Sequence, residues 1–304
     1  MLQAVIDLGT NTFNLLIANQ QSREIIYKEK QAVQLGKGGI SKGIIAAEAI
    51  DRAIKSLLSY KAKLEEYKVT DVTVTGTSAI RNAKNQTDFV QTIFDKTDFK
   101  IKVLSGDEEA SLIYDGVSHF LNFAKEAELI IDIGGGSVEF IIANDHGVQW
   151  MRSIEIGGQR LMDMFHNNDP IDQSDIDKLN SFLSIELEEV FQKCYRHNVK
   201  KLIGSAGSFD TLQEMLLKSN YGKEHDNSIL PIDYFHSICN DLISKKREER
   251  LKIPGMIAMR VDMIVVAALL IKLLIEELDL NQIRVSSFAL KEGVLFGSKN
   301  RNEA

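Results

Sequence analysis

One segment of the chain reads Ile6-Asp-Leu-Gly-Thr-Asn-Thr-Phe-Asn-Leu-Leu-Ile-Ala-Asn-Gln20. It aligns without gaps on Ile131-Asp-Ile-Gly-Gly-Gly-Ser-Val-Glu-Phe-Ile-Ile-Ala-Asn-Asp145, and Ile, Asp, Gly, Ile, Ala and Asn recur at matching places. Each copy has an apolar run, a glycine-containing loop and a second apolar run, which is typical of two strands joined by a turn. Because a fixed internal repeat indicates a duplicated architecture, we expect two similar lobes.

The rest of the chain is predicted to be mixed α/β. Short apolar runs favour strands, and apolar residues at helical spacing favour helices. We expect one lobe over 1–124 and a second over 125–304, with no flexible linker between them and a last helix free to pack back on the first lobe. Further strands are predicted at 24–34, 72–75, 101–104, 147–156, 201–204 and 283–286, and helices at 46–68, 87–95, 106–122, 174–197, 208–218, 231–246, 256–278 and from 290 onward.

Composition excludes several classes of protein. The chain has 304 residues with 44% hydrophobic and 26% charged residues, an ordinary globular balance. Its net charge of −7 argues against nucleic-acid binding through bulk charge. The most apolar stretch, 263–271, is far short of the ~18 residues that a membrane span needs. Two cysteines, Cys194 and Cys239, make no disulfide framework, and no signal peptide is evident, so we expect a cytoplasmic location.

Four short loops, at 7–12, 76–81, 132–137 and 204–208, each follow an apolar strand. Glycine lets a backbone approach a ligand closely and turn its N–H groups inward. One such loop is more often only a tight turn, but four of them, two related by the repeat, indicate phosphate binding. The predicted phosphate ligands are Gly9, Thr10, Asn11, Thr12, Lys37, Ser78, Gly134, Gly135, Gly136, Ser137, Gly207 and Ser208.

Charged residues accompany these loops. Arg81 is either a helix-surface residue or a bidentate clamp on phosphoryl oxygens. Asp7, Asp132 and Glu139 lie on or beside the repeat loops, where acids are unfavourable unless a cation or proton separates them from phosphate. They are therefore predicted ligands of a divalent metal, and Mg²⁺ suits carboxylate and phosphate oxygens. The alternative for Asp7 and Asp132 is a carboxylate bonded to its own turn.

Two glutamates follow Ser105-Gly-Asp. Ser105 and Glu108 match a capping box, and acids in a first helical turn are favoured by the helix dipole. That account suffices for Glu108 but explains Glu109 less well. If Glu109 faces the cleft, the same dipole helps to keep it ionised, as a general base must be.

These motifs, taken together and in order, resemble the exopolyphosphatase/guanosine pentaphosphatase (Ppx/GppA) family, a branch of the actin-like ATPase superfamily. Beyond the two repeats, the resemblance rests on Gly76-Thr-Ser-Ala-Ile-Arg81, Leu104-Ser-Gly-Asp-Glu-Glu-Ala110, Gly204-Ser-Ala-Gly-Ser208 and Leu290-Lys-Glu-Gly-Val-Leu295. It implies two ribonuclease-H-like lobes with the active site in the cleft between them. It further implies that Glu109 is the general base, Asp132 and Glu139 the catalytic acidic pair, and Arg81 a phosphate ligand.

The chain departs from the family pattern at four positions. Val138 replaces a threonine, while Ser287, Phe288 and Lys291 replace the usual Asp, Gly and Arg before the final helix. These changes concern contacts with substrate rather than the catalytic core. Longer family members continue into a helical domain, so a chain that stops at Ala304 corresponds to the short, two-lobe form.

The resemblance and the loops together predict a phosphohydrolase that releases terminal phosphate from inorganic polyphosphate, guanosine pentaphosphate or both. Its partners are then polyanionic substrates with Mg²⁺, and neither nucleic acid nor membrane; a homodimer is left open. Two alternatives remain from the sequence: a small-molecule kinase of the same superfamily, and a nucleotide-sensing module without turnover.

Overall fold

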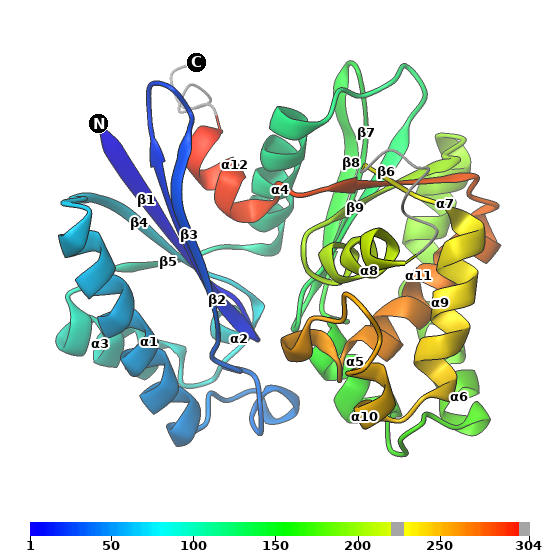
Figure 1. Cartoon of the computed structure of the whole chain (residues 1–304), viewed down its shortest axis with the longest axis horizontal. Coiled ribbons are helices and arrows are strands. Elements are labelled where there is room, and N and C mark those ends of the chain that lie inside the picture. Colours follow the sequence, from blue (N-terminus) through cyan, green and yellow to red (C-terminus); the bar gives the residue numbers. More distant parts are fainter. Residues whose placement is uncertain (220–227, 298–304) are drawn as a thin grey trace.

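The computed structural model describes residues 1–219 and 228–297, and it contains two β-sheets with helices packed against them (Figure 1). The first sheet has the strand order β3-β2-β1-β4-β5. Strands β1, β2 and β3 are antiparallel neighbours, whereas β4 and β5 run parallel to β1. The strands are β1 (Leu2–Leu8), β2 (Thr12–Asn19), β3 (Ile25–Ala32), β4 (Asp71–Gly76) and β5 (Ile101–Val103).

The second sheet repeats this order. It runs β10-β11-β9-β6-β7-β8, so β8-β7-β6-β9-β11 corresponds to the whole of the first sheet. The repeated hairpins also share a register, because Asp7 stands opposite Asn14 and Asp132 opposite Glu139. The duplicated, two-lobe α/β fold is therefore confirmed. The strands are β6 (Glu128–Ile133), β7 (Val138–Asn144), β8 (Gly147–Ile154), β9 (Lys201–Ser205), β10 (Ile229–Leu230) and β11 (Gln282–Ser286).

Helices cover the outer sides of both sheets (Figure 1). The first lobe has a short 3-10 helix η1 (Ile40–Lys42), α1 (Ala47–Glu66), α2 (Ser78–Arg81) and α3 (Gln86–Thr97). The second has α5 (Gly158–Phe165), α6 (Gln173–Glu186), α7 (Glu188–Arg196), α8 (Gly207–Lys218), α9 (Ile232–Ser244), α10 (Arg247–Arg250), the 3-10 helix η3 (Ala258–Arg260) and α11 (Ile264–Leu278).

Two predicted helices were wrong in extent. The helix expected over 174–197 is divided into α6 and α7 at Leu187, whose side chain is fully buried. No Gly or Pro lies at this break, and apolar residues continue at helical spacing across it. The break therefore could not be seen in the sequence pattern. The helix expected over 256–278 begins only at Ile264, because the preceding residues form turns in which Arg250 and Arg247 hold Val261 and Asp262. That irregular segment carries Arg260 toward the space between the lobes.

Two helices cross between the sheets. Helix α4 (Gly106–Phe120) packs on β7 and β8 of the second sheet, although the boundary predicted at 124/125 assigns it to the first lobe. Helix α12 (Leu290–Phe296) packs on β1 and β2 of the first sheet. The two helices lie side by side (Figure 1), and a Cβ on Gly116 or Gly293 would clash with the backbone of the other helix. Glycine at both positions therefore permits this close crossing.

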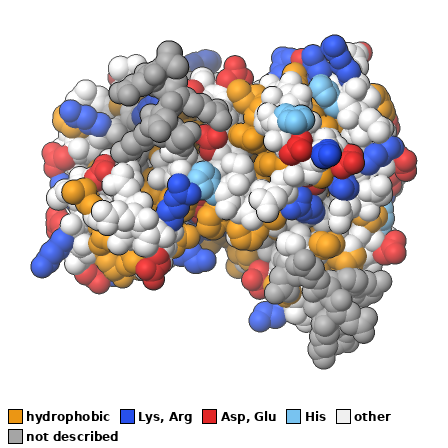
Figure 2. Space-filling model, turned by 90° about the horizontal axis from the view of Figure 1, so that it is seen from above, with side chains coloured by type: hydrophobic (Ala, Val, Ile, Leu, Met, Phe, Trp, Pro, Cys, Tyr) orange, Lys and Arg blue, Asp and Glu red, His pale blue; other side chains and the backbone are white. Residues whose placement is uncertain are grey.

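One face of the molecule carries charged side chains of both signs. Figure 2 shows a waist between two broader halves, and the basic and acidic side chains coloured in that view are interspersed. No helix in the described part of the chain is both long enough and apolar enough to cross a membrane.

Candidate active site

The two repeat loops lie against each other between the sheets. Atoms of Asn11 and Thr10 are only 3.0 Å from the point that a Cβ on Gly135 would occupy. Any side chain there would push the loops apart, so glycine permits their contact. Asp7 and Asp132, which lie at matching places in the two repeats, line the same pocket. The expectation that the two hairpins face each other across one cleft is confirmed.

A cavity of about 100 Å³ lies between the loops. Its walls come from both lobes, from the first turn of α4 and from the start of α12. Lys37 is exposed and does not line the cavity, and Ser208 is buried in α8 without reaching its wall. The predicted phosphate ligands that do line it are Gly9, Thr10, Asn11, Thr12, Ser78, Gly134, Gly135, Gly136, Ser137 and Gly207.

Four carboxylates face this cavity: Asp7, Glu109, Asp132 and Glu139. Burial, which disfavours the charged form, is the main influence on each. It raises the pKa of Asp7 to about 6, that of Asp132 to about 7 and that of Glu109 to about 8. Burial and the neighbouring acids Glu109 and Asp132 also raise the pKa of Glu139 well above its ordinary value. The cavity therefore favours protons or cations beside these acids.

Three cations line the same cavity, and sequence reasoning did not predict any of them as a ligand. Lys30 comes from β3, Arg260 from η3 and Lys291 from α12. Arg260 is only 8% exposed, and within the described chain its guanidinium makes no hydrogen bond or ion pair. Its position before the most apolar stretch of the chain was a signal that it is buried. Lys291, noted only as a family departure, interacts favourably with Asp7 and Asp132.

The first turn of α4 separates its two glutamates. Ser105 Oγ accepts from the amide of Glu108 over 3.2 Å, and Glu108 Oε2 accepts from the amide of Ser105 over 2.9 Å. This capping box was predicted, and it leaves the Glu108 carboxylate at the surface beside Lys102. Glu109 turns the other way and is only 7% exposed in the cavity wall. The two adjacent acids therefore have different surroundings, as the sequence suggested.

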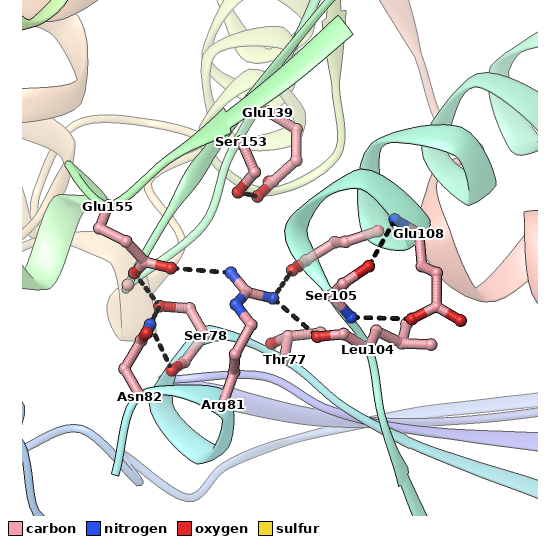
Figure 3. Close-up of polar contacts among 12 residues, drawn as sticks. Thr77, Ser78, Arg81, Asn82, Leu104, Ser105, Glu108, Glu139, Ser153 and Glu155 are labelled. Carbon is pink, nitrogen blue, oxygen red and sulfur yellow. Dashed lines mark hydrogen bonds and ion pairs between the residues drawn. The ribbon is translucent and has the colours of Figure 1, made fainter.

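Arg81 pairs with Glu109 in the cavity wall and with Glu155, which lies outside that wall at what we call the mouth of the cleft. Figure 3 shows the pair of Arg81 with Glu155. Arg81 Nη1 donates to Glu109 Oε2 over 2.8 Å and to the carbonyl of Leu104 over 3.1 Å. Its Nη2 donates to Glu155 over 2.9 Å. The arginine lowers the pKa of Glu109, but burial outweighs it, so Glu109 is less readily ionised than the helix dipole led us to expect.

The packing of α4 on β8 fixes where Glu109 lies. A Cβ on Gly106 would come within 2.6 Å of the Ser153 side chain, so the start of the helix sits directly on the strand. Ser153 Oγ also donates to Glu139 Oε1 over 2.7 Å. One strand residue thus aligns the start of α4 and holds an acid of the second hairpin.

The donor set fits a divalent ion in a limited way. Among the described residues, no three His, Cys, Asp or Glu side chains gather closely enough to hold a metal by themselves. Asp7 Oδ1 is nevertheless buried without a hydrogen-bond partner in the described chain, and Asp132 and Glu139 are cross-strand neighbours. Mg²⁺ is commonly held by one or two carboxylates together with substrate phosphates and water. These residues suit that kind of site rather than a closed protein cage.

Two duplicated α/β lobes enclose a cavity lined by glycine-containing loops and acids, so the chain is a two-lobe α/β protein with its candidate site between the lobes. The chain belongs to the Ppx/GppA phosphatase family, whose profile matches residues 16–302.

Individual relatives agree with this family. An exopolyphosphatase from Cytophaga hutchinsonii has a solved structure with a TM-score of 0.92 and 39% identity, covering 97% of each chain. An Aquifex aeolicus Ppx/GppA enzyme has a TM-score of 0.79 and 25% identity, covering 98% of this chain and 99% of that one. A Haemophilus influenzae protein, named as a candidate exopolyphosphatase, is 26% identical over 96% of this chain and 90% of its own length.

Proposed function

We propose that this protein is a phosphohydrolase that releases the terminal phosphate of inorganic polyphosphate, with Glu109 as the general base. The observation that carries the proposal is the position of Glu109, a buried carboxylate that opens into the cavity formed by the two glycine-rich loops. The Cytophaga relative is described as an exopolyphosphatase, and 39% identity over nearly all of both chains supports the same substrate class here.

The terminal phosphate is expected to sit between the repeat loops. Loop N–H groups and the hydroxyls of Thr10, Thr12 and Ser137 supply hydrogen bonds, and Arg260 supplies an unpaired positive charge. In its ionised form, Glu109 takes the proton from a water that attacks in line with the leaving phosphate. Because burial raises the pKa of Glu109 to about 8, this step is expected to become faster as pH rises toward that value. In phosphoryl transfer, positioning and electrostatic stabilisation supply most of the rate, which is what fixed loops and a buried guanidinium provide.

A bound Mg²⁺ would neutralise charge on the transferring group and on the leaving phosphate. Asp132 and Glu139, together with Asp7, are the residues that would hold it. Their raised pKa values are then expected to fall when the ion binds, because a nearby positive charge favours the ionised form.

The test is orthophosphate release from long-chain polyphosphate by the purified protein with Mg²⁺. We expect turnover without a second substrate. ATP-dependent phosphorylation of an acceptor would instead favour a kinase, and binding of nucleotide or polyphosphate without turnover would favour a sensing module.

Guanosine pentaphosphate is a second candidate substrate, because a larger cavity adjoins the first. This cavity has a volume of about 620 Å³ and shares Asn14, Lys30 and Lys291 with the phosphate cavity. The rings of Phe120 and Phe288, 5.3 Å apart, form part of its wall, and aromatic rings suit a purine base. Comparing kcat/KM for guanosine pentaphosphate with that for polyphosphate would show whether the second cavity is used.

A further inference from the structure

A carboxylate occupies the donors expected to receive phosphate at the mouth of the cleft. Glu155 follows β8, and its side chain accepts three interactions: from Ser78 Oγ at 2.5 Å, from Arg81 Nη2 at 2.9 Å and from Arg160 Nη2 at 3.2 Å (Figure 3 shows the first two). These bonds and the charge of Arg81 together hold the pKa of Glu155 below its usual range despite partial burial. It is therefore anionic at neutral pH.

The group of donors around Glu155 resembles a phosphate site. Two guanidinium groups and a hydroxyl converge on one pair of oxygens, and this is the arrangement by which arginines recognise phosphate and carboxylate alike. Ser78 and Arg81 were predicted from the sequence as phosphate ligands, and Ser78 lines the phosphate cavity. The side chain of Arg81 is 17% exposed and Ser78 is buried, so both donors are largely shielded from solvent.

The same carboxylate bridges the lobes. Ser78 and Arg81 belong to α2 of the first lobe, whereas Glu155 and Arg160 belong to the second. Arg160 Nε additionally donates to the carbonyl of Gly136 over 2.9 Å, which ties this group to the second repeat loop. An anion that enters here must either displace Glu155 or fail to reach these donors.

We propose that Glu155 is an internal competitor of phosphate: it holds Ser78, Arg81 and Arg160 in the resting protein and yields them to a phosphate of the substrate. The inference rests on the proposed function, since it assumes that phosphate uses these donors. A polyanion bound at several phosphates can displace the carboxylate, whereas a single orthophosphate competes poorly. Glu155 is thus a specificity-determining residue that disfavours the product and favours longer substrates.

The experiment compares Glu155→Gln with the parent protein and with Glu189→Gln. Glu189 makes a matched control because it also pairs with an arginine, Arg152, and is 41% exposed against 37% for Glu155. Affinities for tripolyphosphate and orthophosphate are measured by calorimetry at fixed ionic strength, and orthophosphate inhibition is measured during turnover. Glu155→Gln is expected to bind both anions about 1.5- to fivefold more tightly, the range of a partly exposed ion pair, with the larger factor for orthophosphate.

In that variant, KM for polyphosphate should fall and orthophosphate should inhibit more strongly, while Glu189→Gln should match the parent. Unchanged or weaker anion binding by Glu155→Gln, equal shifts in both variants, or no anion binding by any of the three proteins would overturn the proposal. Glu155→Ala, checked by thermal melting, repeats the measurement if the glutamine variant is unstable. Failure of the proposed function would give a different result. Anion binding would then shift in Glu155→Gln as expected, but none of the proteins would hydrolyse polyphosphate.

Discussion

The first hairpins of the two lobes have the same strand pairing and register, but the residue opposite the matching aspartate differs between them. Asp7 stands opposite Asn14, and Asp132 stands opposite Glu139. Asn14 Nδ2 donates to Asp7 Oδ2 over 3.0 Å, whereas Asp132 accepts only a 3.5 Å bond, from Ser205. The bond from Asn14 lowers the pKa of Asp7, which burial raises to about 6, against about 7 for Asp132.

This difference shows how a duplicated frame acquires two roles. An acid beside an amide accepts a hydrogen bond from its neighbour, which favours its ionised form and helps to hold it in place, as Asn14 does for Asp7. Two acids beside each other need a proton or a cation between them. We therefore expect a metal ion to depend more on the second hairpin than on the first, and the chemistry to occur at Glu109 between them.

The largest effect is expected from Glu109→Gln, which removes the base from between the hairpins while keeping its shape. Positioned acid–base catalysis contributes about 10²–10⁴-fold, so kcat should fall by that factor, roughly 3–5 kcal/mol of barrier. Affinity for polyphosphate should hold or rise, because glutamine cannot ionise and so never places a negative charge beside the polyanion. Steady-state phosphate release and calorimetric binding measure both quantities.

Glu108→Gln is the matched control for that variant. It changes the adjacent acid of the same helical turn, whose role is capping. Its expected effect is a stability loss of about 0.3–1 kcal/mol with turnover intact. If Glu109→Gln keeps turnover within a fewfold of the parent, or if Glu108→Gln is the inactive variant, Glu109 is not the base.

The difference between hairpins is tested most directly by Glu139→Gln and Asn14→Asp. The first removes an acid from the second hairpin, and the second adds one to the first. Turnover should require divalent cation, and Glu139→Gln should raise the Mg²⁺ concentration for half-maximal activity by at least 10–100-fold, the loss known for residues that merely support a metal ligand. Asn14→Asp should change this Mg²⁺ concentration less. Full activity after exhaustive chelation would show that the reaction does not use a metal ion.

A smaller effect is expected for Arg81→Ala, since Arg81 contacts the base and the mouth of the cleft but does not line the cavity. A hydrogen bond to a charged group contributes roughly 1.5–3 kcal/mol, so kcat/KM should fall about ten- to hundredfold. Arg81→Lys should restore only part of it, because lysine lacks the planar fork. Unchanged kinetics for the alanine variant would make Arg81 a surface residue.

Much of this fold could be predicted from one sequence because the repeat is local. The match between 6–20 and 131–145 specifies two hairpins, and their glycines can be read as turns. The division of the long helix at Leu187 could not be predicted, because apolar spacing continues across it. Nor could the crossing of α4 onto the second sheet, which depends on tertiary packing.

The residues of the candidate site also fall into those that local sequence predicts and those that only tertiary packing brings together. Residues in strand-end loops, such as Thr10 and Ser137, could be located from sequence because loops at one edge of a sheet gather. Lys30 and Arg260 reach the cavity from distant elements, and no motif accompanies them. Glu155 gave no signal either, since its significance lies in the arginines that the fold brings to it. Lys37 is the opposite case: its glycine-rich surrounding indicated a ligand, but its exposed side chain does not line the cavity.

The subtlest expected difference between the hairpins lies in the pH dependence of stability without metal. An acid whose pKa is higher in the folded than in the unfolded protein stabilises the fold at low pH, and that stabilisation is lost as pH rises to the folded pKa. From an ordinary value of 3.8, Asp7 rises to about 6 and Asp132 to about 7. At about 1.4 kcal/mol per pKa unit, full ionisation removes roughly 3 kcal/mol through Asp7 and roughly 4 kcal/mol through Asp132.

Chelated parent protein should therefore lose melting temperature between about pH 4 and pH 7, and Asp132→Asn should flatten this decline more than Asp7→Asn. The asparagine variants are isosteric and cannot ionise, so the change in slope reports each acid together with its effect on the neighbouring acids. Asp279→Asn, at a side chain that is 94% exposed, controls for the loss of one charge and should keep the parent slope. Melting is followed at each pH with and without Mg²⁺, which should restore stability at neutral pH in the parent. Equal slopes for Asp7→Asn and Asp132→Asn would mean that Asn14 does not distinguish the two hairpins, because the amide would then contribute no more to Asp7 than Ser205 contributes to Asp132.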